Sequence, residues 1–118
     1  MAQKQNVIQT KTFSFALKIA KLCKTLQNSS EYMASKQLFK SGTSIGANVE
    51  EALAAQSRKD FVSKMSIALK EARETLYWLR LLQESQLVEG NYLNRIDEAK
   101  EIMRILTSII KTTLEGNS

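Results

Sequence analysis

An apolar repeat in the second half of the chain constrains the fold more than any other feature of the sequence. Its positions follow one another at alternating steps of four and three residues: Phe61, Met65, Ala68, Ala72, Thr75, Leu79 and Leu82. Residues with this spacing lie on one face of an α-helix, and a run of this length forms a seam about six turns long. The sequence therefore predicts a long helix over residues 60–84 that packs against other elements along its whole length.

Three other segments carry apolar residues at helical spacing. They predict helices over roughly residues 8–27, 32–57 and 91–114. Short polar or glycine-containing stretches separate the segments. We expect the first break, at residues 28–30, to supply cap residues, and we expect Asp60 to be the N-cap of the third helix.

Composition favours a single all-helical domain. The 118 residues include no proline and four glycines, so the turn residues that a β-sandwich or barrel needs are nearly absent. The length fits one domain, and helices joined by short turns pack as antiparallel neighbours. We therefore expect residues 1–118 to form an all-α, up-down-up-down four-helix bundle.

Two glycines lie inside the predicted second helix, at Gly42 and Gly46. A glycine in a helix interior costs roughly 1 kcal/mol relative to alanine. A close approach by another helix would compensate for this cost.

The residue inventory disfavours most classes of enzyme. The chain has no histidine, which is the commonest general base and metal ligand, and its one cysteine, Cys23, excludes an internal disulfide. Cys23 falls on an apolar stripe, so we expect it in the core. The amino-terminal residues lack the pattern of a signal peptide, and no apolar run is long enough to span a membrane. We expect a cytoplasmic protein with no cofactor, no metal and no catalytic residues.

Acidic residues at helical spacing leave two interpretations open. Glu51, Glu71 and Glu74 are placed like the carboxylates of di-metal bundles, but those sites pair glutamate with histidine, which this chain lacks. The preferred interpretation is a polar network that fixes the register of the second and third helices, formed by Ser44, Asn48, Glu51, Glu71 and Glu74. The alternative is that the glutamates are solvated on an outer face.

The net charge of +5 is unevenly distributed. Residues 1–59 contain nine basic and three acidic residues, giving +6, and residues 60–118 contain eight and nine, giving −1. Such asymmetry favours a polyanionic partner through long-range attraction.

Basic side chains gather on one face of each of two predicted helices. The first face holds Lys11, Lys18 and Lys21, and the second holds Lys70, Arg73, Tyr77 and Arg80. Positive charges suit phosphates, and an interposed aromatic ring suits a base. The competing interpretation is a solvated surface with local pairing, for example between Lys70 and Glu74. We predict binding of RNA or DNA through shape and charge, without base reading.

Apolar residues beside the main stripes predict a subunit interface, because a monomeric bundle needs one buried stripe per helix. The residues concerned are Trp78, Leu81 and Ile105. They also support an alternative function, a protein-interaction scaffold with no nucleic-acid role. Its partner would be an acidic or apolar protein surface.

A pattern in the predicted second helix is specific enough to indicate a family. The series Ser-Ile-x-Ala-Asn-hydrophobic-x-Glu falls on Ser44, Ile45, Ala47, Asn48, Val49 and Glu51. The motif Lys59-Asp60-Phe61 and the stretch over residues 68–80 follow it. With these motifs, most of the chain resembles the four-helix-bundle family that includes the 23S rRNA intervening-sequence proteins.

That resemblance implies a left-handed bundle assembled as a ring-shaped homopentamer. Members of the family are encoded in insertions within ribosomal RNA genes or elsewhere in bacterial genomes, and no definite activity is established for them. A related accessory protein of diversity-generating retroelements is a basic pentamer that binds nucleic acid and a reverse transcriptase. The resemblance thus implies a non-catalytic, nucleic-acid-binding adaptor. Many members have glycine after the motif glutamate, whereas this chain has alanine at position 52, so we expect its second helix to run one turn longer.

Overall fold

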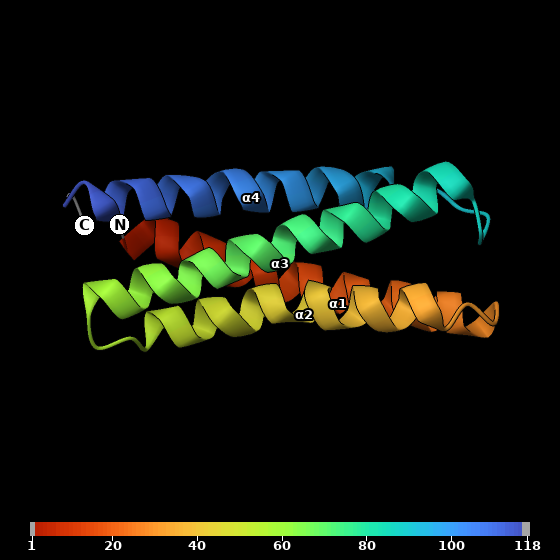
Figure 1. Ribbon diagram of the computed structural model, residues 1–118, viewed down its shortest axis with the longest axis horizontal. Helices are drawn as coiled ribbons and strands as arrows, with labels where there is room; N and C mark the ends of the chain where they lie inside the picture. Colours follow the sequence, from red (N-terminus) through yellow and green to blue (C-terminus); the bar gives the residue numbers. More distant parts are fainter. Residues whose placement is uncertain (1, 117–118) are drawn as a thin grey trace.

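Four helices lie side by side and run alternately up and down (Figure 1). The computed structural model describes residues 2–116, with side chains from residue 7 onwards. The helices are α1 (Ala2–Asn28), α2 (Met33–Leu53), α3 (Arg58–Ser85) and α4 (Leu93–Leu114). Each helix contacts the next one in the chain, and α4 returns to contact α1. The chain is an all-α four-helix bundle, as predicted, measuring 47 × 20 × 19 Å along its principal axes.

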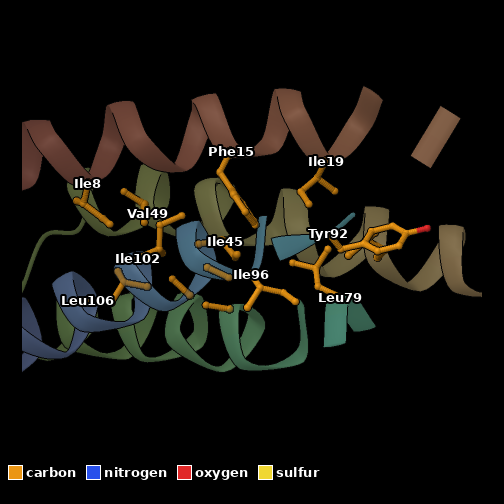
Figure 2. Packing of buried hydrophobic residues seen from close by; sticks show 14 of the residues in the cluster. Ile8, Phe15, Ile19, Ile45, Val49, Leu79, Tyr92, Ile96, Ile102 and Leu106 are labelled. Carbon is orange, nitrogen blue, oxygen red and sulfur yellow. The ribbon is translucent and has the colours of Figure 1, made fainter. Parts of the chain in front are cut away.

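The core is a continuous column of aliphatic side chains along the bundle axis. Figure 2 shows side chains from all four helices pointing inward, including Ile19, Ile45, Leu79 and Leu106. The predicted seam of α3 is buried from Met65 to Leu82. Burying each such side chain contributes roughly 1.5–3 kcal/mol, so the four apolar faces together stabilise the fold.

Both glycines of α2 face α1 at close range. A Cβ atom on Gly42 would lie 2.7 Å from the Ile19 Cγ2 atom, and a Cβ on Gly46 would lie 3.4 Å from the Thr12 backbone oxygen. Close helix approach at these positions is therefore confirmed. It is tightest at Gly42, where no larger residue fits without displacing Ile19.

The first turn agrees with the predicted caps at the end of α1 and differs from them at the start of α2. Ser30 adopts the left-handed conformation (φ 63°), which ends α1. The Glu31 carboxylate then accepts a hydrogen bond from the Ala34 backbone N–H at 3.0 Å and so caps α2. The serines at positions 29 and 30 do not serve as the side-chain cap.

The second turn differs from the prediction in two ways. Helix α2 ends at Leu53 and not at residue 57, so the expected longer helix is wrong. The N-cap of α3 is Ser57, whose hydroxyl oxygen accepts a hydrogen bond from the Asp60 backbone N–H at 3.0 Å. The backbone of Ser57 is extended, so α2 cannot continue through this residue. Asp60 lies in the first turn of α3, where the helix dipole stabilises its negative charge.

Candidate nucleic-acid interface

The lysines predicted as one basic face of α1 are mostly engaged with α4. The Lys11 ammonium lies 3.0 Å from the Glu101 carboxylate, and the Lys18 ammonium lies 2.8 Å from the Glu98 carboxylate. Glu98 also pairs with Arg95, at 2.8 Å. The structure therefore places Lys11 and Lys18 as bridges between two helices, with their charge largely balanced. Lys21 is exposed and forms no ion pair with any described residue.

The basic stripe of α3 points outward, as its spacing predicts. Lys70, Arg73 and Arg80 are all exposed. Arg80 lies 3.7 Å from Glu84, whereas Lys70 and Arg73 make no ion pair within residues 7–116, and the anticipated contact of Lys70 with Glu74 is not formed. Most of the positive charge on this stripe is available to a ligand.

The aromatic ring of this stripe is also accessible. Tyr77 is 61% exposed, and its ring packs edge-on against Trp78 with centroids 5.4 Å apart. The contact with Trp78 leaves much of the tyrosine ring in solvent. An exposed ring beside cations can stack on a nucleobase.

Helix α4 carries a second basic stripe that the sequence analysis missed. Lys100, Arg104 and Lys111 line a shallow outward hollow of about 600 Å³, together with Met103, Thr107 and Ser108. The three basic side chains are exposed and form no ion pair in the described chain. Their spacing of four and then seven residues is helical, so the periodicity test used for α3 would have found them.

The stripes of α3 and α4 lie beside the contact between these helices. Thr75 faces α2 through a hydrogen bond to Ser41, whereas Gln83, on the opposite flank of α3, accepts a hydrogen bond from the Tyr92 backbone N–H at the start of α4. Leu76 is one heptad before Gln83 and therefore lies on the α4-facing flank, and Arg80 is one turn beyond Leu76. On α4, Glu98 and Glu101 mark the flank that faces α1, because they pair with lysines of that helix. The basic stripe of α4 lies on the flank away from α1.

We define the α3/α4 basic face by the outward cations of these two helices. Its members are Lys70, Arg73, Arg80, Lys100, Arg104 and Lys111. Along α3 the face extends from Lys70 to Arg80, which is about 15 Å, and along α4 from Lys100 to Lys111, which is about 17 Å. Two adjacent rows of cations of this length can contact several phosphates at once.

The five residues predicted to form a polar network are not joined between helices. Asn48 donates to the Ser44 backbone oxygen and Ser44 donates to the Lys40 backbone oxygen, both within α2. Glu51 is exposed, Glu71 is half-buried, and the Glu74 carboxylate accepts a hydrogen bond from the Trp78 ring N–H at 3.4 Å. The buried polar contact between α2 and α3 is instead Thr75 Oγ1 to Ser41 Oγ, at 3.0 Å.

The three residues predicted as a subunit interface do not share one surface. Trp78 is half-buried and lies one turn from Thr75, on the α2 side of α3, and Leu81 beside it is 37% exposed. Ile105 is one turn beyond Glu101, on the α1 side of α4, and is half-buried. The structure therefore separates Ile105 from Trp78 and Leu81 by the width of the bundle.

Groups that could support metal or nucleophilic chemistry are not assembled in the part of the chain that the structure describes. No three acidic or cysteine side chains within it come close enough to hold a metal ion. Burial raises the pKa of the Cys23 thiol to about 11, and the Cys23 Sγ atom donates a hydrogen bond to the Ser35 backbone oxygen. A buried, protonated thiol is a poor nucleophile. No described helix is both long and apolar enough to cross a membrane.

The fold and this surface define a four-helix-bundle protein with a basic face built on two adjacent helices. The chain belongs to the family of the 23S rRNA-intervening sequence proteins, whose sequence profile matches residues 4–108. Family membership confirms the resemblance inferred from residues 44–51.

A solved structure supports the same assignment. The chain is similar to a protein of unknown function from the S23 ribosomal protein family of Bacteroides thetaiotaomicron, with 48% sequence identity and a TM-score of 0.87. The match covers 92% of this chain and 99% of the other. A comparison with curated proteins finds no match.

Proposed function

We propose that this protein is a non-catalytic, cytoplasmic adaptor that binds structured RNA or DNA through the α3/α4 basic face. The observation that carries the proposal is that five of the six cations on this face are exposed and have no acidic partner among the described residues: Lys70, Arg73, Lys100, Arg104 and Lys111. Arg80 and Tyr77 extend the face at one end. Phosphate contacts made by such side chains are strong and independent of base sequence.

The distribution of ion pairs favours this face over the lysines of α1. Lys11 and Lys18 would have to leave Glu101 and Glu98 before binding a phosphate, at a cost in bundle stability. The cations of the α3/α4 basic face can bind a phosphate without breaking an interhelical contact. Of the three α1 lysines predicted to bind phosphate, Lys21 alone has no ion pair among the described residues, and one charge is too little for tight binding by itself.

The proposal is tested by fluorescence anisotropy of labelled hairpin RNA and duplex DNA at about 50 and 200 mM salt. Six phosphate contacts predict a loss of affinity of about 10³-fold between these salt concentrations. Absence of binding at the lower salt concentration, or binding that does not depend on salt, would contradict the proposal.

We also propose that the protein acts as a homo-oligomer, as the family resemblance implies for a pentameric ring. A ring joins two different surfaces of each subunit. The placement of Trp78 and Leu81 on one side of the bundle and Ile105 on the other suits such a contact. Light scattering measures the mass: we expect a multiple of 13.3 kDa, and a mass of one chain would contradict the proposal.

A further inference from the structure

A groove between α1 and α2 combines an apolar floor with a basic rim. Its volume is about 580 Å³, and its lining includes Ala20, Cys23, Lys24, Tyr32, Lys36 and Phe39. It lies on the half of the molecule that carries the excess positive charge and away from the α3/α4 basic face. Nothing in the proposed nucleic-acid function uses it.

Large apolar side chains are exposed along this groove and continue beyond it. Tyr32 is 62% exposed and Phe39 is 49% exposed. On α1, Leu17 precedes Ala20 by three residues and Phe13 precedes Leu17 by four, so both extend the same strip, and they are 51% and 63% exposed. We call this surface the α1/α2 strip. Contiguous apolar surface of this kind marks an interaction site, whereas isolated exposed apolar residues do not.

The charges beside the groove have one sign, whereas the Phe13 end of the strip adjoins Glu50, which accepts a hydrogen bond from Gln9 one turn before Phe13. Lys24 and Lys36 line the groove, both are exposed, and neither forms an ion pair within residues 7–116. The groove lining contains no acidic residue. The nearest acidic side chain along the chain, Glu31, is engaged in capping α2. An occupant of the groove must therefore be apolar at its centre and acidic at the edge that meets Lys24 and Lys36.

The length of the strip matches one helix. From Phe13 to Gln27 it extends for about 21 Å along α1, which is the length of a helix of about 14 residues. Laying an amphipathic helix into a groove between two helices buries its apolar residues at positions i, i+4 and i+7. Its outer carboxylates would then reach Lys24 and Lys36.

We propose that the α1/α2 strip binds an acidic amphipathic helix of a partner protein. A second copy of this chain docked symmetrically on the same strip would bring the lysines of both subunits together, which is unfavourable, and the ring proposed above joins the surfaces of Trp78/Leu81 and Ile105 and leaves the strip free. The groove offers a nucleic acid two unpaired lysines next to several exposed apolar side chains. This surface is a poor match to a phosphate backbone.

The probe for this proposal is a fluorescein-labelled peptide of about 18 residues with leucine at helical spacing and glutamate elsewhere. A matched peptide carries lysine in place of each glutamate. Anisotropy with the full chain is expected to show saturable binding of the glutamate peptide and at least tenfold weaker binding of the lysine peptide. Equal binding of the two peptides, or no binding of the glutamate peptide, would overturn the proposal.

Two variants locate the binding, and each changes exposed positions only. Lys24→Glu combined with Lys36→Glu is expected to weaken the glutamate peptide at least tenfold, and Leu17→Ser combined with Phe39→Ser should do the same. The control, Lys100→Glu combined with Lys111→Glu, makes the same charge change on α4 and should leave peptide binding unaltered. A loss with the control as large as that with Lys24→Glu/Lys36→Glu would mean that net charge alone attracts the peptide, and the proposal fails.

Light scattering and RNA binding of the same variants separate the remaining outcomes. If Leu17→Ser/Phe39→Ser converts an oligomer into single chains, a second copy covers the strip and the proposal is wrong. If the strip variants lose RNA binding and retain peptide binding, the strip is a binding site for nucleic acid and the proposal is also wrong. Failure of RNA binding in the unaltered protein, with the peptide still bound, would overturn the proposed function and leave this inference in place.

Discussion

At the scale of single residues, Gly42 is where the packing of α1 on α2 leaves the least room. A methyl group there would meet Ile19 at 2.7 Å, a distance that requires a shift of the side chain or of the helix. Overpacking of this kind costs typically about 1–3 kcal/mol. Alanine also improves helix propensity by up to about 1 kcal/mol, so we expect Gly42→Ala to lower the free energy of unfolding by up to about 2 kcal/mol, measured by urea denaturation.

Gly46, one turn further along α2, provides the matched control. Its added methyl would make ordinary contacts with Thr12 from 3.4 Å outwards, while alanine improves helix propensity by up to about 1 kcal/mol. Gly46→Ala should therefore leave the free energy of unfolding unchanged or raise it. Equal destabilisation by the two substitutions would mean that the close approach is not specific to Gly42.

The buried thiol of Cys23 predicts a pH dependence of stability. Its pKa is raised from 9.0 to about 11 in the folded protein because burial disfavours the thiolate. The unfolded chain therefore loses this proton first, and the stability that the neutral thiol provides is complete below pH 9 and is lost as the pH rises towards about 11.

A comparison with Cys23→Ala isolates this effect. Burial also raises the pKa of Tyr92, which acts in the same direction, but this group is present in both proteins. The free energy of unfolding should fall less steeply from pH 9 to pH 11 in the variant than in the unaltered protein. Parallel curves would show that the thiol is not protected in the fold.

At the scale of elements, the hydroxyl pair between α2 and α3 fixes how these helices meet. Thr75 donates to Ser41 at 3.0 Å in a site where both side chains are fully buried. Thr75→Val should lower the free energy of unfolding by about 1 kcal/mol. The substitution removes the Thr75 hydroxyl, so the buried Ser41 hydroxyl loses the hydrogen bond that it accepts from Thr75. In a double-mutant cycle with Ser41→Ala, the combined loss should be smaller than the sum. Simple additivity would show that the pair is not coupled.

The contact between α1 and α4 depends partly on exposed ion pairs. Lys11 and Glu101 are 40% and 49% exposed, so their pair contributes about 0.2–1 kcal/mol. Lys11→Glu should lower the thermal midpoint slightly, and the exchange Lys11→Glu/Glu101→Lys should restore it. Lys24→Glu is the control, since Lys24 has no ionic partner in the described chain. If the thermal midpoint stays lowered in Lys11→Glu/Glu101→Lys, the two side chains do not form a specific ion pair.

The helices themselves could be predicted from the sequence, but the ends of α2 and the caps could not. Apolar spacing locates a buried face because the period of a helix is fixed. The segment after Leu53 is rich in alanine, which favours helix, so propensity alone extends α2 too far. It ends because Ser57 must be extended to cap α3, which is a requirement of the next element and not of α2.

At the scale of the whole molecule, the basic faces show what periodicity cannot determine. The helical period of the sequence correctly predicts that Lys70, Arg73 and Arg80 lie on an outer surface. It could not show that Lys11 pairs with Glu101, because the two residues are 90 positions apart in the chain and meet only when α4 packs on α1. Such pairs decide which positive charges are available to a phosphate, so the fold keeps the α3 part of the predicted site and replaces its α1 part with the cations of α4.

If the α3/α4 basic face binds nucleic acid and the paired lysines of α1 do not, neutralising the two sets of cations should have different effects. The most direct test is the salt dependence of hairpin-RNA affinity for Lys100→Gln/Arg104→Gln beside Lys11→Gln/Lys18→Gln, which remove the same charge. We predict that the first variant binds more weakly and that its slope of log affinity against log salt decreases in magnitude by about 2. The second should match the unaltered protein. An unchanged slope for the first variant, or an equal change for both, would show that nucleic acid does not bind through the α3/α4 basic face.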